Sequence, residues 1–549
     1  MCSKFFCFKI GGTFQGALST TQESPPKPVK INQTMIIPPH DTAPALQAPT
    51  ILDVIRYRYH HGSNLGSIFV LERWLSGSMY LNGAKGDSEL DAITASLEET
   101  GLDETRAKWE SHWSTYVTDA DLIYLSRTAN CTTFRLPIGY FTLGPSFCAG
   151  TPFEGDASQV YVNAWSACKS LISRAYSYGI GTIIDFHAVP GGANGEGHSG
   201  TNSGKAELWG NTAHLDLAKR CLSFIAQEEA KGGLPGVAGI QLCNESVWAA
   251  YGMYQWYDDV IGAIAQAGSR APIYISDGWD LPTALGYSQS KNTVYTQGPT
   301  NPIIVDTHKY YTFSDSDRSQ SPQQIIARIP SELGELDGKD GSVVDRGACA
   351  VLIGEYSCVL DTQTWNRVPS EQRSALTQQF GHAQSARWQT RSAGCTFWTY
   401  RMDWMDGDDW GFKQQSQLGN LPPPSSLLLP FDEVRSRVTY AENNRHQLMT
   451  VAVQQHEGYW NSTSPDTRFE HWRYAAGWNV GFADAMAFYQ MRADGGFGAA
   501  AKGADRIGSL DIWTLKRLRD SGQGGGFLWE WEQGFRRGVG DFLNIVGAQ

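Results

Sequence analysis

The stretch Val237-Ala-Gly-Ile-Gln-Leu-Cys243 is a short apolar run that leads directly to Glu245. A second run, Ala348-Cys-Ala-Val-Leu-Ile353, leads to Glu355, 110 residues further along the chain. Continuous apolar runs of this length are typical of strands that are buried on both faces, as in a parallel sheet. If each βα unit takes about 30–40 residues, the two glutamates stand about three units apart in one (β/α)8 barrel.

Other apolar runs alternate with helical stretches between about Ile51 and Lys413. Six further runs, each followed by polar residues, occupy Phe69–Leu71, Cys131–Phe134, Gly181–Ile184, Ile273–Ile275, Ile303–Val305 and Cys395–Trp398. We expect Phe69–Leu71 to form the first strand, with Glu72 at its carboxyl end. Eight strand-then-helix units indicate an α/β fold, and their number predicts a (β/α)8 TIM barrel. In such a barrel the residues that follow the strands gather at one face.

The chain is expected to have three parts. Residues 1–50 are predicted to form a flexible lead, because residues 20–48 are rich in Pro, Thr, Gln and Ser. Residues 51–418 form the predicted barrel, and the breaker cluster Gly419–Ser426 marks its end. Residues 419–549 have helical periodicity near 431–451, 469–491, 510–518 and 527–546. We predict a helical C-terminal extension whose apolar faces, including its tryptophans, pack on the barrel.

The composition is that of a large soluble protein, with 549 residues of which 41% are hydrophobic and 18% charged. The net charge of −12 argues against nucleic acid and anionic membranes as partners. No apolar run of about 18 residues predicts a membrane span. Aromatic residues make up 12% of the chain. Most of them are expected in the core, but sugar rings also pack on aromatic faces, so the composition suits a carbohydrate enzyme.

The N-terminal sequence predicts no signal peptide, because Lys9 interrupts the short apolar stretch Met1–Ile10 and no cleavage site follows it. The ten cysteines show no paired spacing, and several lie in strand-like runs, where a thiol behaves as a small core residue. This pattern disfavours a disulfide framework and a metal site. We therefore predict reduced thiols and a cytoplasmic protein, with export by a non-standard route as the alternative.

Six short motifs follow one another along the barrel segment. They are Phe134-Arg135-Leu-Pro-Ile-Gly, Asp185-Phe-His187, Asn244-Glu245, His308-Lys-Tyr310, Gly354-Glu355-Tyr356 and Phe397-Trp398. In this order they resemble glycoside hydrolase family 5 over roughly residues 55–412. The stretches Asn64–Trp74 and His187–Gly200 look like the fungal exo-β-1,3-glucanase and β-glucosidase branch of that family. The resemblance leaves the C-terminal extension unexplained.

The resemblance implies a role for each of nine residues. Glu245 corresponds to the family's acid/base and Glu355 to its nucleophile, the two carboxyl groups that a retaining glycosidase needs. The supporting residues that it implies are Arg135 and Tyr310 as partners of Glu355, Asn244 for the sugar 2-hydroxyl, His187 and His308 near Glu245, Trp398 under the reacting sugar, and Glu72 for its outer hydroxyl groups. It implies no cofactor and no metal. We expect the two carboxyl groups to lie about 5–5.5 Å apart, as in retaining enzymes.

The expected function is a retaining β-glycoside hydrolase that releases terminal β-D-glucosyl units, in the manner of an exo-β-1,3-glucanase. Three departures from the family's pattern lie around the leaving group. Arg73 and Ser246 stand where proline is usual, and the strand-three loop lacks the usual Asp-Asn pair before Ser199-Gly200. These departures keep open a β-glucosidase or diglycosidase that acts on phenolic or sterol glycosides, and a transglycosylase.

Two functions from other classes are disfavoured. A carbohydrate-binding pseudoenzyme would be expected to lack a catalytic carboxylate, whereas both are present here. A metalloenzyme on the same barrel would take its ligands from His187, Glu245, His308 and Glu355, but their spacing matches no metal motif. The predicted partner is therefore a carbohydrate or a small-molecule glycoside.

Overall fold

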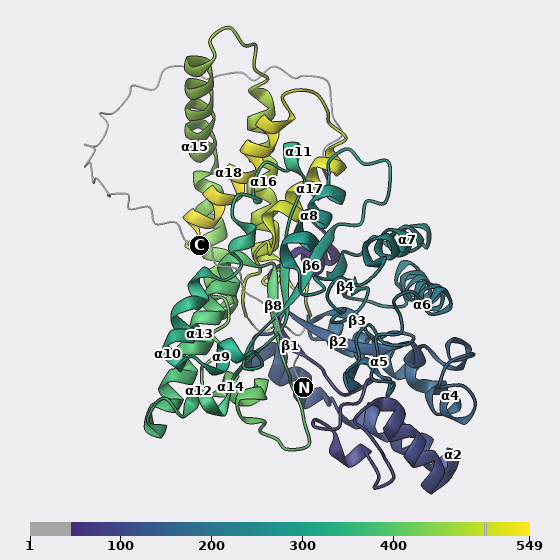
Figure 1. Ribbon diagram of the computed structural model, residues 1–549. Coiled ribbons are helices and arrows are strands. Elements are labelled where there is room, and N and C mark those ends of the chain that lie inside the picture. Colours follow the sequence, from purple (N-terminus) through teal and green to yellow (C-terminus); the bar gives the residue numbers. More distant parts are fainter. Residues whose placement is uncertain (1–45, 499, 501, 549) are drawn as a thin grey trace. The chain divides into compact units, whose positions relative to one another are not determined.

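The computed structural model describes residues 46–498, 500 and 502–548. The predicted flexible lead lies outside the described residues, apart from residues 46–50. Within the described part, eight parallel strands close into a barrel in the order β1 to β8 (Figure 1). The strands are β1 His60–Asn64, β2 Thr133–Gly139, β3 Gly181–Ala188, β4 Val237–Gln241, β5 Ile273–Ser276, β6 Ile303–Tyr311, β7 Val351–Leu360 and β8 Gly394–Phe397. The predicted (β/α)8 TIM barrel is confirmed.

Helices precede β1 and follow the strands (Figure 1). In this segment they are α1 Ile51–Tyr57, α2 Glu89–Thr115, α3 Asp119–Ile123, α4 Asp156–Val160, α5 Ala164–Ser177, α6 Thr212–Ala230, α7 Met253–Gln266, α8 Leu281–Lys291, α9 Asp315–Arg318, α10 Pro322–Arg328, α11 Val343–Arg346, α12 Thr362–Trp365, α13 Arg373–Arg391 and α14 Phe412–Gln417. Local sequence fixes several starts. Thr50 and Ser88, for example, form capping boxes with Asp53 and Asp91 at the starts of α1 and α2.

The strands are buried along nearly their whole length, as their apolar sequences predict. Every residue of β3 and β4 is buried. Neighbouring strands are parallel, and Ile184 of β3, for example, lies opposite Leu136 of β2 and Ile240 of β4. Because all strands run in the same direction, the polar residues at their carboxyl ends meet at one face of the barrel.

The prediction for the first strand is wrong. β1 is His60–Asn64, and Phe69–Leu71 lies in the connection that follows it. The sequence His-His-Gly-Ser-Asn contains no apolar run, so hydrophobic patterning does not detect it. The strand is buried because its polar side chains find partners inside the barrel. His60 Nδ1, for example, lies 2.8 Å from Thr133 Oγ1.

The predicted helical extension is confirmed, and its helices gather at one end of the barrel (Figure 1). They are α15 Phe431–Thr463, α16 Trp472–Gln490, α17 Leu510–Ser521 and α18 Leu528–Ile545. Glycines allow α16 and α18 to approach closely. A Cβ atom at Gly477 would lie 2.0 Å from the carbonyl oxygen of Trp531, so only glycine fits at this crossing.

The extension packs against the amino-terminal ends of the strands. One continuous apolar core joins Ile183, Ala238 and Ile304, near the starts of β3, β4 and β6, to Trp478 and Trp513 of the extension. Helix α1 belongs to the same core. These tryptophans are therefore packing residues, on the face opposite to that where the strands end.

A buried ionic cluster joins the two ends of the described chain. Arg58, which follows α1, lies 3.5 Å from Asp505, and Arg492 donates to the same carboxylate at 2.7 and 3.0 Å. All three side chains are buried. Burial alone would raise the pKa of Asp505, but the two guanidinium groups hold it below its ordinary value. The carboxylate is therefore ionised and shared by the first and last parts of the fold.

The described residues include eight cysteines, all buried and none in a disulfide. Cys2 and Cys7 lie outside the described residues. None of the helices in the described part is long and apolar enough to cross a membrane. The cytoplasmic location stays a prediction.

We expect Asp505→Asn to lower the free energy of unfolding by about 3–5 kcal/mol, because two buried guanidinium groups lose their shared carboxylate. Urea denaturation at pH 7 measures the change. The folded-state pKa of Asp505 is lowered, so its contribution is present above the unfolded-state pKa of about 3.9 and is lost as the pH falls below that value. The difference between wild type and variant should therefore narrow below about pH 4.

The matched control is Asp466→Asn, which changes an exposed aspartate of the extension and should shift stability by about 0.5 kcal/mol at most. An Asp505→Asn protein as stable as the control at pH 7 would show that the cluster does not hold the two ends together.

Candidate active site

The residues predicted for the site lie in the strands or in the segments that follow them. They are Glu72 after β1, Arg135 in β2, His187 in β3, Asn244 and Glu245 after β4, His308 and Tyr310 in β6, Glu355 in β7 and Trp398 after β8. The barrel brings them to one face, and the contacts described below link them into one cluster.

Arg135 is a fully buried cation at the centre of this cluster. Its guanidinium group bonds Glu355 at 2.9 Å, Asn64 at 3.0 Å, Gln241 at 2.9 Å, Asn244 at 2.7 Å and Asp185 at 3.0 Å. Burial alone would lower the pKa of Arg135, but the surrounding carboxylates raise it above its ordinary value. The guanidinium therefore stays charged and orients side chains from several strands at once.

Glu355 is held between two donors. Arg135 Nη1 donates to its Oε1 at 2.9 Å, and the Tyr310 hydroxyl donates to its Oε2 at 2.8 Å. Burial and the Glu355 charge raise the pKa of Tyr310 well above its ordinary value, so the hydroxyl keeps its proton. Hydrogen bonds of this kind favour an ionised carboxylate in a fixed orientation, which is what a nucleophile needs.

Glu245 faces Glu355 across the site. One ligand oxygen of each carboxylate and a nitrogen of His308 lie within 4.8 Å of one another. Glu245 has a left-handed backbone conformation, with φ of 41°, and its carbonyl accepts a hydrogen bond from Asn194 at 3.0 Å. Such conformations in non-glycine residues cluster at functional sites.

His308 connects Glu245 to a second carboxylate. Its Nδ1 lies 2.8 Å from Glu245 Oε1, and its Nε2 lies 3.1 Å from Asp306 Oδ2. Burial would lower the pKa of His308, but Glu355 and Asp306 raise it well above its ordinary value. Burial would raise the pKa of Glu245, but the hydrogen bond from His308 and nearby histidines lower it to about 2. The pair is therefore an imidazolium beside a carboxylate.

This protonation state bears on the metal alternative. Glu245, His308 and Glu355 are close enough for one ion to reach all three. An imidazolium, however, has no lone pair to offer, and both nitrogens of His308 already face carboxylates. Arg135 also places a fixed positive charge on Glu355. The donor set fits a proton-transfer site better than a metal centre.

His187, Asn244 and Trp398 line the interior of the site. His187 Nδ1 lies 2.6 Å from Asp185 Oδ2, and its Nε2 lies 3.4 Å from the amide of Asn244. The ring of Trp398 is nearly parallel to that of His187, with centroids 5.9 Å apart. Trp398 is buried against Leu75 and Met402, so the position of its ring is fixed.

Glu72 is buried, and its carboxylate accepts a hydrogen bond from the Trp74 indole at 2.9 Å. Burial raises the pKa of Glu72, and the charges of His198 and His187 oppose this rise. The Trp74 ring packs against Trp410, with centroids 5.2 Å apart. The hydrogen bond from the Trp74 indole, and not an ion pair, therefore positions the carboxylate of Glu72.

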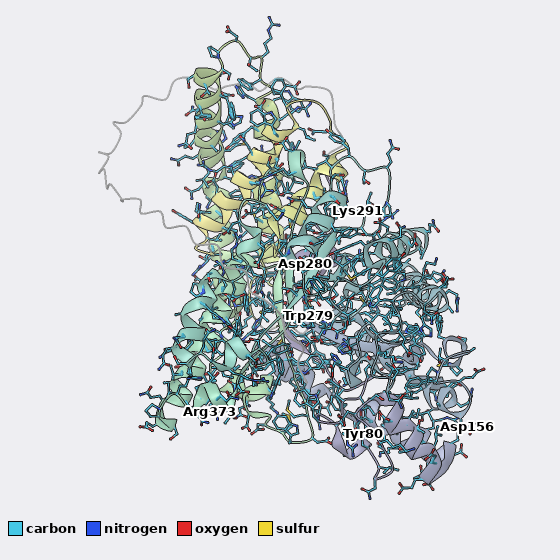
Figure 2. All side chains as sticks on the ribbon, viewed as in Figure 1. Tyr80, Asp156, Trp279, Asp280, Lys291 and Arg373 are labelled. Atoms are coloured by element: carbon cyan, nitrogen blue, oxygen red, sulfur yellow. The ribbon has the colours of Figure 1, made fainter. Side chains whose placement is uncertain are left out.

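Exposed aromatic side chains surround the site. They follow five different strands and include Trp74, Trp248, Trp279, Phe313 and Trp404, each at least 40% exposed. Trp279 and Asp280 lie between β5 and α8, whereas Lys291 lies at the other end of α8, on the side of the C-terminal helices (Figure 2). The mouth of the site is therefore apolar, although its interior is ionic.

Sequence reasoning missed several residues of the cluster. Asn64 and Gln241 bond Arg135, and Asp306 bonds His308 and Gln241. A polar residue inside an apolar strand was the available signal for Gln241. For Asp306 the signal was a polar residue directly after the apolar run Ile303–Val305. His198 was also missed: its Nε2 lies 3.4 Å from Glu245 Oε2.

Two family models match the chain. The model described as cellulase (glycosyl hydrolase family 5) matches residues 97–403. The model described as the glucan 1,3-beta-glucosidase 3 C-terminal domain matches residues 441–546, which the motifs of the barrel left unexplained.

Individual proteins show the same similarity. Glucan 1,3-beta-glucosidase 3 of Schizosaccharomyces pombe is 30% identical over 485 residues, which cover 88% of this chain and 94% of that protein. An uncharacterized glycosyl hydrolase of Saccharomyces cerevisiae is 30% identical over 518 residues, covering 91% and 95%. Among solved structures, rutinosidase from Aspergillus niger has a TM-score of 0.51 at 18% identity and covers 67% of this chain and 99% of that one. This last similarity concerns the fold.

We expect Gly354→Ala to disrupt the site, because a Cβ atom at this position would lie 1.9 Å from Asp306 Oδ1. A displaced Asp306 would disturb its hydrogen bonds to Gln241 and His308. Overpacking of this kind costs about 1–3 kcal/mol, which thermal denaturation measures.

The matched control is Gly286→Ala in α8, where no atom lies within 4 Å of the added methyl group. Its stability should stay equal or rise by up to about 1 kcal/mol, since alanine favours helix. Equal melting temperatures for the two variants would contradict the packing argument at Gly354.

Proposed function

The chain belongs to glycosyl hydrolase family 5, and from this premise we propose that it is a retaining, exo-acting β-glycosidase that releases terminal β-D-glucosyl units. The relative from Schizosaccharomyces pombe, a glucan 1,3-beta-glucosidase, matches both the barrel and the extension. The proposed reaction is a double displacement with Glu355 as nucleophile and Glu245 as acid/base.

The observation that carries this proposal is the spacing and unequal support of the two carboxylates. One oxygen of Glu245 and one of Glu355 lie within 4.8 Å of each other, which suits the separation of about 5–5.5 Å between carboxyl groups in retaining glycosidases better than the roughly 6.5–9.5 Å of inverting ones. Glu355 is oriented by a guanidinium and a hydroxyl, as an attacking carboxylate should be. Glu245 instead bonds an imidazolium, so this pair holds the proton that a general acid requires.

In the first step, Glu355 attacks the anomeric carbon and the bond to the leaving oxygen breaks. Glu245 accepts the proton of His308 on Oε1. Once its carboxyl group has rotated, it donates this proton to the leaving oxygen from the position that Oε2 occupies in the structure. Of the neighbouring charges, that of Glu355 raises the pKa of His308 most and so does most to keep it protonated. Forming the glycosyl ester removes this charge, so His308 holds its proton less tightly as the leaving group needs it. The positive charge of His308 and the negative charge of Glu355 are therefore both lost in this step.

In the second step, water attacks the anomeric carbon of the glycosyl ester and Glu355 leaves as a carboxylate. Glu245 accepts the proton of the water, and the imidazolium and the carboxylate are restored together. Asn244 and His187 support the hydroxyl groups of the sugar, and Trp398 supports its ring. If a sugar hydroxyl replaces water, the same step is a transglycosylation.

Azide rescue tests the two roles. With a 2,4-dinitrophenyl β-glucoside as substrate, Glu355→Ala should lose several orders of magnitude in turnover and yield the inverted glucosyl azide. Glu245→Ala should yield the retained azide, because Glu355 still forms the ester. The exposed Glu442→Ala of α15 serves as the control and should behave as wild type. NMR of the product identifies its anomer, and the same azide anomer from both site variants would sink the assignment.

A second candidate substrate class is a glucoside or diglycoside of a small apolar alcohol. The exposed aromatic side chains at the mouth, Trp248, Trp279 and Phe313 among them, favour it. An aromatic rim suits a phenolic or sterol aglycone as well as a second sugar ring. We place this class second because the relative from Schizosaccharomyces pombe, matched over 88% of this chain, is named a glucan 1,3-beta-glucosidase.

A substrate panel decides between the two classes. Laminarin, laminaribiose, an aryl β-glucoside and an aryl rutinoside are compared by kcat/KM. We expect laminaribiose and laminarin to be cleaved from their ends, with glucose as the first product. Laminarin left intact while either aryl glycoside is cleaved fast would overturn the glucanase proposal in favour of the second class.

A further inference from the structure

His198 lies beside the proposed acid/base and has no assigned role. It belongs to a short 3-10 turn, Gly197–Ser199, in the connection between β3 and α6. Its Nε2 lies 3.4 Å from Glu245 Oε2, and its ring lies edge-on to His187 with centroids 5.5 Å apart. This nitrogen is buried and has no hydrogen-bond partner among the described residues.

The two oxygens of Glu245 have different surroundings. Oε1 bonds His308, whose side chain is only 4% exposed and is tied on its other side to Asp306. Oε2 faces His198, whose side chain is 20% exposed. Since Oε1 is occupied, Oε2 is the oxygen that can reach a leaving oxygen. His198 is therefore next to the position from which Glu245 transfers the proton, on the side open to substrate.

The loop that carries His198 is fixed in place and also holds the backbone of Glu245. Asn194 of this loop donates to the Glu245 carbonyl at 3.0 Å and accepts from the Glu196 amide at 2.9 Å. The turn ends at Gly200, which has φ of 81° and where a Cβ atom would lie 2.7 Å from that of Ala188. The loop therefore holds the imidazole of His198 in place beside Glu245.

We propose that His198 is a positioning residue for the acid/base: it orients Oε2 of Glu245 toward the leaving oxygen and thereby assists proton transfer to poor leaving groups. The inference rests on the proposed function, since it assumes that Glu245 is the acid.

The test uses a series of β-glucosides whose leaving groups differ in basicity, from 2,4-dinitrophenol through p-nitrophenol and phenol to an alkyl alcohol. A dinitrophenolate leaves without a proton, whereas an alkoxide requires one. His198→Asn and His198→Gln should leave kcat/KM for the dinitrophenyl glucoside within about twofold of wild type. For the alkyl glucoside kcat/KM should fall by about tenfold or more, since this parameter reports the glycosylation step.

The matched control is His214→Asn, since His214 lies at the start of α6 and bonds the Glu207 carbonyl at 2.8 Å, away from Glu245. It should show no dependence on the leaving group. A uniform loss across the series in the His198 variants, or no loss at all, would overturn the inference. The dinitrophenyl substrate reports misfolding separately, because a misfolded variant loses activity toward every substrate.

Glu245→Ala distinguishes a failure of the inference for His198 from a failure of the proposed function. If it shows a steep dependence on leaving-group basicity while His198→Asn shows none, His198 has no role in proton transfer and the proposed function stands. If Glu245→Ala itself shows no such dependence, the acid/base assignment fails and the proposal for His198 fails with it.

Discussion

The burial of one guanidinium group is the constraint on which the rest of the site depends. Arg135 is fully buried, and an isolated charge in that environment would be strongly destabilising. The barrel compensates by surrounding it with Asp185 and Glu355 and with neutral acceptors such as Asn64 and Gln241. Since these partners come from different strands, the cation can be satisfied only when the barrel is closed. The requirement that stabilises the interior also fixes the orientation of Glu355.

The same electrostatics separates two chemically identical side chains. Glu355 has a permanent positive charge at 2.9 Å, whereas Glu245 has a neighbour, His308, whose charge depends on a proton. A fixed cation suits a carboxylate that must remain ionised, and a titratable one suits a carboxyl group that exchanges a proton. The difference arises because the two positive groups come from different strands, Arg135 from β2 and His308 from β6.

Much of this arrangement could be predicted from the sequence, because apolar runs and the polar residues that end them determine both strands and site. The prediction failed at β1, where His60 and Asn64 are buried by hydrogen bonding and not by hydrophobicity. Gln241 and Asp306 were not identified either, since a single polar residue in a strand does not reveal its partner. The helices of the extension were visible in the periodicity, but an apolar face does not say which surface covers it. That they cover the amino-terminal ends of the strands follows only from the packing.

The position of the extension has a consequence for biosynthesis. Arg58 and Asp505, whose side chains lie 3.5 Å apart, are separated by 447 residues along the chain. At about 5–20 residues per second, a ribosome needs roughly 20–90 s to make the second partner after the first. In the later part of that interval, once Ile304 and Leu352 have been made, the amino-terminal ends of β6 and β7 lack the helices that cover them. The nascent barrel therefore exposes the apolar surface at the amino-terminal ends of its strands until synthesis is nearly complete. Surfaces of this kind require chaperone protection.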